Sequence, residues 1–246
     1  MKKKSLYFWG ATFISAVAFS FASCSQEDDF IIDSGLDIDS QVPLTRADGG
    51  DRPNQIPKVD DQCGPYAATK VAMNKGVEQE TGQKNKDGSP KKAKVGSCNY
   101  PASRYYQEFN NTHESRTWDY CDKRGNKIES GPLAGTYKGA SDHMYPSALL
   151  AIGKETGVLE GGYEYFETYE ELVSRLSSSS FKEKHPAGTY IIHNPRARGG
   201  QGHFSVGMGM TKNGKVKTED ALGYPKYSKD DDAKPGDEKT GWTVLY

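Results

Sequence analysis

Two short stretches of the chain hold residue types that together could perform nucleophilic chemistry. The first is the run DQCGPYAA at 61–68, in which Cys63 stands where a loop turns into a helix. Pro65 suits the first helical turn, and small apolar residues recur after it at helical spacing. A thiol at the start of a helix faces the positive end of the helix dipole, which favours the nucleophilic thiolate. Taken alone, this run fits a buried or disulfide-bonded cysteine equally well.

The second stretch lies far downstream, where the glycine-rich run RGGQG at 198–202 leads into His203. His203 opens a β-rich segment, which predicts a histidine at the rim of a sheet, and Asp220 follows one strand later. A lone histidine at a strand end is usually structural. Together with Cys63 the set suits acyl chemistry, because imidazole takes the thiol proton and returns it to the leaving amine while a carboxylate orients the ring.

These residues resemble the cysteine, histidine and aspartate blocks of the C39-like branch of papain-like cysteine peptidases. The blocks read QCGPYA at 62–67, GHFSV at 202–206 and DALGY at 220–224. The resemblance covers about residues 53–227 and implies an α+β fold in which a helix-borne cysteine packs on an antiparallel β-sheet. It also implies that Cys63 is the nucleophile, His203 the general base and acid, and Asp220 the orienting residue. The implied substrate is a peptide or protein, with no cofactor and no metal.

The chain departs from that pattern in two places. The family usually supplies an oxyanion-hole glutamine about six residues before the cysteine, where this chain has Pro57. Gln55 is the first candidate for that role and Gln62 the second. Ala221 stands where the family commonly has proline after the aspartate, a change without an expected consequence.

Other functions fit the residues less well. The chain lacks the short motifs of zinc peptidases, phosphate-binding loops and serine hydrolases, and its net charge of -1 gives no field that would attract nucleic acid. Two alternatives stay open: a cysteine amidase or acyl transferase that uses the same triad, and a non-catalytic binding module tethered by lipid.

The N-terminal segment predicts export. A lysine-rich start and an apolar run end in small residues before Cys24, which resembles a bacterial lipoprotein signal peptide, with Phe21 in place of the usual leucine. The resemblance implies cleavage after residue 23 and a lipid on Cys24. We therefore expect a signal peptide at 1–23, a flexible acidic tether at 24–52 and a peptidase domain at 53–246. The acidic residues after Cys24 favour an outer-membrane, surface-exposed lipoprotein.

Hydrophobic periodicity and helix-capping residues predict the helices and strands that must position these side chains. Helical spacing indicates helices at 64–75, 100–109, 145–155 and 168–176, the last opened by a capping box at Thr168 and Glu171. A hairpin or loop is expected at 81–96, and short strands with turns at 118–137. Period-two runs predict strands at 189–193, 203–208, 215–218 and 242–246, of which the first three should pair in sequence.

Two further expectations concern distant pairs. With Cys24 lipidated and Cys63 a thiol, Cys98 and Cys121 are left as a natural disulfide in an oxidising envelope. A two-residue turn at Asn213-Gly214 would set Asp220 opposite Gly207, roughly 13 Å along the strand from His203. We therefore expect a wider or bulged loop that brings Asp220 beside His203.

Overall fold

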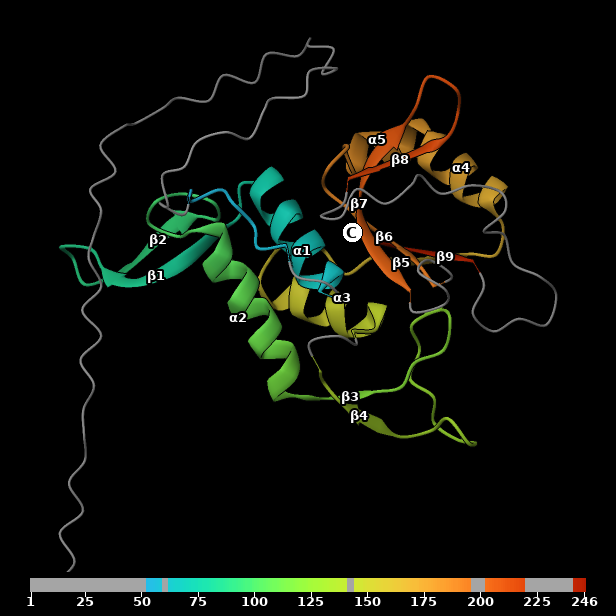
Figure 1. Ribbon diagram of the computed structural model, residues 1–246, viewed down its shortest axis with the longest axis horizontal. Helices are drawn as coiled ribbons and strands as arrows, with labels where there is room; N and C mark the ends of the chain where they lie inside the picture. Colours follow the sequence, from blue (N-terminus) through green and yellow to red (C-terminus); the bar gives the residue numbers. More distant parts are fainter. Residues whose placement is uncertain (1–51, 59–61, 141–143, 196–201, 220–240) are drawn as a thin grey trace, which may run out of the picture. The chain divides into compact units, whose positions relative to one another are not determined.

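A five-stranded antiparallel sheet organises the computed structural model, which describes residues 52–58, 62–140, 144–195, 202–219 and 241–246. The strand order is β5-β9-β6-β7-β8. The bounds are β5 (Tyr163–Phe166), β6 (Ile191–Asn194), β7 (His203–Met210), β8 (Val216–Glu219) and β9 (Trp242–Leu245). Helices cover both faces of the sheet (Figure 1), so the fold is α+β, as the sequence predicts.

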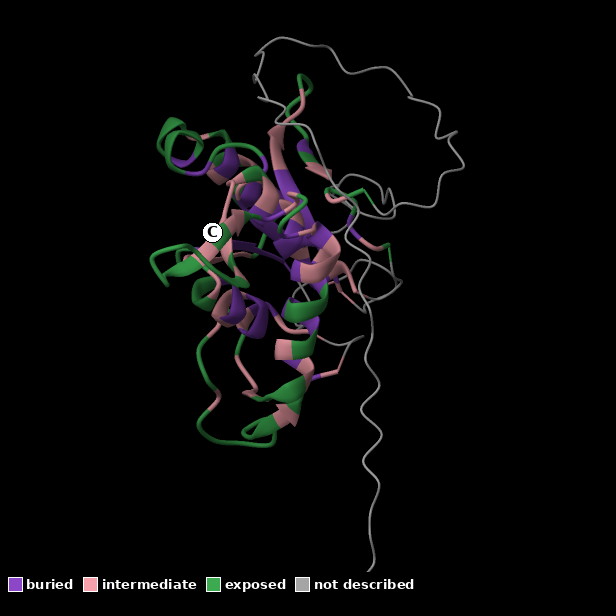
Figure 2. Ribbon diagram, turned by 90° about the vertical axis from the view of Figure 1, so that its left-hand side faces the viewer, coloured by how far each residue is buried: buried purple, intermediate pink, exposed green. Residues whose placement is uncertain are grey.

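One face of the sheet carries α1 (Cys63–Asn74) and α3 (Pro146–Glu155), and α2 (Ala102–Ser115) packs against these two helices. On this face Ile191, Phe204 and Leu245 pack into one core with Val71 of α1 and Leu149 of α3. Because side chains alternate along a strand, every second residue of β6, β7 and β9 points into this core. Figure 2 shows the buried residues gathered along the sheet and on the helix surfaces turned towards it.

The opposite face carries α4 (Tyr169–Ser177) and α5 (Ser179–Lys184), which pack on Ile192, Trp242 and Val244. The Thr168 hydroxyl accepts the Glu171 backbone N–H, and the Glu171 carboxylate accepts the Thr168 N–H, so the predicted capping box is confirmed. This reciprocal pair satisfies two N–H groups that an α-helix leaves without partners. It therefore fixes where α4 starts above the sheet.

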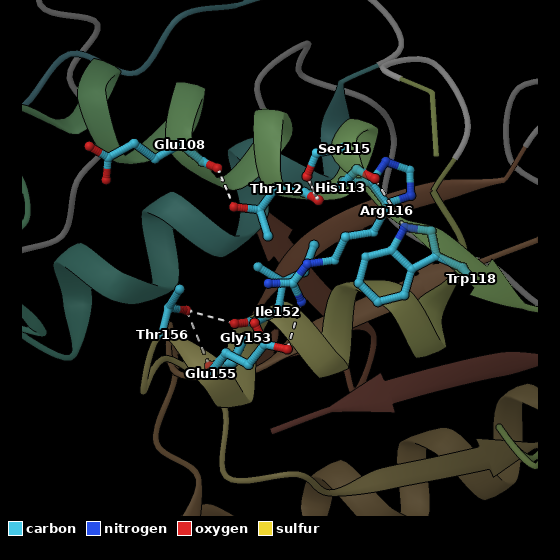
Figure 3. Close-up of polar contacts among 10 residues, drawn as sticks. All are labelled: Glu108, Thr112, His113, Ser115, Arg116, Trp118, Ile152, Gly153, Glu155 and Thr156. Atoms are coloured by element: carbon cyan, nitrogen blue, oxygen red, sulfur yellow. Dashed lines mark hydrogen bonds and ion pairs between the residues drawn. The ribbon is translucent and has the colours of Figure 1, made fainter. Parts of the chain in front are cut away.

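Two small ribbons lie outside the main sheet: β1 (Glu78–Lys84) pairs with β2 (Pro90–Lys94), and β3 (Thr117–Asp119) with β4 (Thr136–Lys138). Figure 3 shows how the second ribbon joins the helices. Arg116, at the end of α2, forms an ion pair with Glu155 of α3 (Nη1 to Oε1, 2.7 Å), and the Trp118 indole donates to the His113 carbonyl (3.0 Å). The C-terminal ends of α2 and α3, the two helices that pack against α1, are thus held together.

Most elements agree with the sequence expectations, and the differences have physical causes. The second helix runs on to Ser115, beyond the predicted 109, because Phe109 and His113 continue its buried face among polar residues. Strand β5 and helix α5 were not predicted, since each is short and carries no clear periodicity. No helix in the described ranges has the length and apolar character needed to cross a membrane. The predicted signal peptide, Cys24 and most of the tether lie outside these ranges.

Candidate active site

Cys63 is the first residue of α1, as predicted from its sequence context. The first hydrogen bond of the helix runs from the Tyr66 N–H to the Gln62 carbonyl (3.3 Å), and Pro65 has no N–H to donate. The N–H groups of Cys63 and Gly64 precede that first bond, so neither has an acceptor within the helix. Donors of this kind, beside a half-buried thiol, can stabilise negative charge.

The sulfur of Cys63 contacts strand β7 directly. The Phe204 backbone N–H donates to the Cys63 Sγ over 3.4 Å. Hydrogen bonds alternate along a strand, and the Gly207 N–H donates to Tyr190 towards β6, so the Phe204 N–H points away from β6. The start of α1 therefore lies beside the edge of β7 that faces β8. There the Cys63 sulfur accepts a hydrogen bond that a carbonyl oxygen of a neighbouring strand would otherwise accept.

This contact brings Cys63 and His203 together. His203 precedes Phe204, and one peptide unit separates its Cα from the Phe204 nitrogen, so the sulfur lies at most about 6 Å from the His203 Cα. His203 is buried, with 1% of its surface exposed, and it pairs across β6 with Asn194. The backbone of His203 and the Cys63 sulfur, parts of two of the three predicted triad residues, thus lie close in space although 140 positions separate them in the chain.

The hairpin that leads towards Asp220 is wider than a two-residue turn and is bulged, as expected. The Thr211 N–H donates to Lys215 (2.8 Å), and the register shifts between Gly207 and Met210. Glu219 consequently pairs with Val206, whereas the tight turn would pair it with Met208. The shift of two positions moves the end of β8 roughly 7 Å closer to His203. Asp220 itself lies outside the described residues, so its role stays a prediction.

The two oxyanion-hole candidates differ in position. Gln55 is exposed in the segment before Ile56, and nothing in its described contacts links its side chain to Cys63. Gln62 adjoins Cys63 and is half-buried, and its Oε1 accepts a short hydrogen bond from the Tyr106 hydroxyl of α2. The geometry therefore favours the second candidate over the first.

His193 is a neighbour of the site that the sequence analysis missed. It pairs with Phe204 across β6 and β7, and the two ring centroids lie 4.5 Å apart. Its Nε2 faces Gly202, where an added Cβ would come within 2.8 Å of it. Burial, with a smaller contribution from His203, lowers the pKa of His193 to about 3, which keeps this ring neutral. Ile191 and His193 alternate with their neighbours in a β-rich run, and this pattern could have predicted that His193 shares a sheet face with Ile191.

The predicted disulfide between Cys98 and Cys121 is wrong. Cys63, Cys98 and Cys121 are thiols in the structure, and the Cys121 sulfur lies 3.7 Å from the Asp119 carbonyl. Cys98 precedes α2 and Cys121 follows it, and 14 residues of helix span about 21 Å. A disulfide needs Cα atoms within about 7 Å, and the structure does not join these two cysteines.

Other parts of the described structure offer less chemistry. A cavity of about 720 Å³ lies beside β5 and α4, is lined by Tyr165, Glu171 and Arg175 among others, and includes neither Cys63 nor His203. Within the ranges that the structure describes, no three His, Cys, Asp or Glu side chains are grouped to hold a metal ion. Comparison with known protein families, with curated proteins and with solved structures finds no match for this chain.

Proposed function

We propose that this protein is a cysteine peptidase with Cys63 as nucleophile and His203 as general base and acid. The observation that carries the proposal is the 3.4 Å hydrogen bond from the Phe204 N–H to the Cys63 sulfur. It brings a helix-initiating thiol to the strand position that follows a histidine. An arrangement of this kind supports acyl chemistry, because the proposed nucleophile and its base lie on two rigid elements.

The reaction follows from these positions. The Cys63 sulfur attacks the substrate carbonyl carbon, a sulfur–carbon bond forms, and the carbonyl electron pair moves onto oxygen. When the C–N bond breaks, the proton held by His203 goes to the leaving amine. Water then cleaves the thioester with His203 as base. Asp220 is proposed to orient the imidazole.

We further propose that the enzyme works in the cell envelope, anchored by lipid at Cys24. This location rests on the apolar run and small residues that precede Cys24 in the sequence. A lipid anchor followed by an acidic tether would hold the peptidase domain near a membrane surface and leave it free to meet peptide or protein substrates.

Thiol labelling tests the proposal with an internal control. Cys63 is half-buried and Cys98 is exposed, so accessibility alone predicts faster alkylation of Cys98. If His203 activates Cys63, iodoacetamide at pH 6 labels Cys63 faster than Cys98, and His203→Ala removes that advantage. Equal or slower labelling of Cys63, unchanged in His203→Ala, would make it a structural cysteine.

Turnover separates peptidase activity from related acyl chemistry. The Cys63→Ser variant keeps nearly the same side-chain volume but has a hydroxyl that imidazole activates poorly here, so we expect folded, inactive protein. Mass analysis of a peptide library and of peptidoglycan fragments after incubation shows which bond the parent cleaves. Cleavage of peptidoglycan amides alone would identify an amidase.

A further inference from the structure

Tyr106 is a buried tyrosine of α2 that reaches the residue next to the nucleophile. Only 4% of its surface is exposed, and it forms a small core with Ile56 and Ala102, against which the partly buried Tyr66 packs. Its hydroxyl donates to the Gln62 Oε1 in a short hydrogen bond. It also lies close enough to Cys63 for the charge of a thiolate to be felt at the phenol. The phenol, the amide and the thiol therefore form one group.

The hydrogen bond fixes which end of the amide is left for a substrate. Oε1 is turned to Tyr106, so the Nε2 group, with two N–H donors, is the opposite end of the same planar unit. The amide belongs to the residue before Cys63, whose own N–H has no acceptor within α1. A side-chain N–H and a backbone N–H beside one nucleophile are the elements of an oxyanion hole.

We propose that Tyr106 is a positioning residue that orients Gln62, so that the Gln62 Nε2 stabilises the oxyanion formed when Cys63 attacks a carbonyl. The inference rests on the proposed function. As the sulfur–carbon bond forms, the negative charge develops on the carbonyl oxygen, where the Gln62 amide and the Cys63 N–H donate to it. No proton moves to Tyr106 or Gln62 in this step.

The environment of Tyr106 suits this task. Burial, and in smaller part the charge of Cys63, raises the pKa of Tyr106 to about 12. The hydroxyl therefore remains protonated through the range in which a thiol enzyme works and stays a donor to Oε1. Without that donor, the amide is free to rotate and to present its oxygen to the developing negative charge, which would be repulsive.

Two probes separate this role from activation of the thiol. Iodoacetamide alkylation creates no oxyanion, whereas a peptide aldehyde adds to Cys63 to form a tetrahedral adduct that needs the oxyanion hole. We expect Gln62→Ala to lower kcat about a hundredfold, in the range for loss of one such donor. Tyr106→Phe, which only misplaces the donor, should lower kcat about tenfold. Aldehyde affinity should fall in parallel, with KM and the alkylation rate of Cys63 unchanged.

A matched control lies next in the chain. Tyr105 is also buried on α2, and its hydroxyl shares a hydrogen bond with Thr156 at 2.8 Å, away from Cys63. Tyr105→Phe therefore loses a buried phenol and should keep both kcat and aldehyde affinity. In the double variant of Tyr106 and Gln62, kcat should fall no further than in Gln62→Ala, because Tyr106 acts through the amide.

The possible outcomes are distinct. Unchanged aldehyde affinity in Tyr106→Phe overturns the positioning role, and so does a change in its Cys63 alkylation rate, which would mean that Tyr106 acts on the thiol. Unchanged kcat in Gln62→Ala places the oxyanion hole elsewhere. If the parent protein shows neither fast alkylation nor aldehyde binding, the proposed function fails, and this inference fails with it.

Discussion

The fit between α1 and the sheet can be tested at Gly64, which follows Cys63. A Cβ at this position would lie 2.9 Å from the Met144 Sδ, 3.3 Å from a Leu149 methyl and 3.5 Å from the Phe204 ring. The first distance is about 1 Å shorter than an ordinary contact between such atoms. In Gly64→Ala, either Met144 retreats or the start of α1 moves away from β7.

The effect on stability should be modest. Alanine in place of a helical glycine stabilises by about 1 kcal/mol. Crowding in a packed core costs about 1 to 3 kcal/mol, and the lower end applies because the nearest atoms are ends of flexible side chains. We therefore expect Gly64→Ala to lower the free energy of unfolding by about 0 to 1 kcal/mol, measured by urea denaturation.

The effect on activity should be much larger. A displacement of about 0.5 to 1 Å would open the Sγ to Phe204 nitrogen distance from 3.4 Å to about 4 Å or more, and a misplacement of about 1 Å can cost about a hundredfold in rate. Gly153→Ala is the matched control, because this helical glycine of α3 is crowded by Leu159 at 2.7 Å. We expect it to lose stability and retain kcat/KM. Full activity in folded Gly64→Ala would show that activity does not depend on the close seating of α1 against β7.

Two other predictions concern the anchor and acid stability. Cys24→Ala should move the protein from the membrane fraction to the soluble fraction with activity intact, and retention in the membrane would contradict lipid anchoring. For His193, the pKa is about 3 in the folded chain and near 6.5 when unfolded, so the unfolded state binds more protons between these values. Stability should fall below pH 6.5, by less than about 1.4 kcal/mol per pH unit because the ring is only half-buried. Urea unfolding of His193→Gln should show a flatter fall between pH 7 and 4, and an equal fall would remove His193 as a cause.

Local sequence patterns predict where the helices and strands of this chain lie better than they predict which elements or residues pair with one another. Pro65 and the small residues after it marked α1, and the capping box at Thr168 marked α4, because both signals act within one helical turn. The hairpin register was inferred from the distance that catalysis would need, and the bulge after Gly207 agrees with it. The disulfide failed because pairing cysteines by elimination takes no account of where the fold places Cys98 and Cys121.

Tyr106 shows what sequence reasoning could not reach. A buried tyrosine at helical spacing is the ordinary content of a core, and nothing in the run around it points to Gln62, 44 positions earlier. The contact exists because α1 and α2 pack side by side, which brings the second turn of α2 to the N-cap residue of α1. Only the packing shows that the hydroxyl of this tyrosine reaches Gln62, the residue before Cys63.

Strand β9 explains why the site depends on distant parts of the chain. Its residues Trp242–Leu245 are buried and lie between β5 and β6, so the strand is interior on both sides and both faces. A strand of this kind has no polar alternation, and its sequence therefore cannot indicate its neighbours. Leu245 faces the core that seats α1, and Trp242 faces the core under α4. The sheet that holds β7 against Cys63 is thus complete only when this last segment has joined it, and Cys63 and the start of β7 come together through contacts that no local pattern encodes.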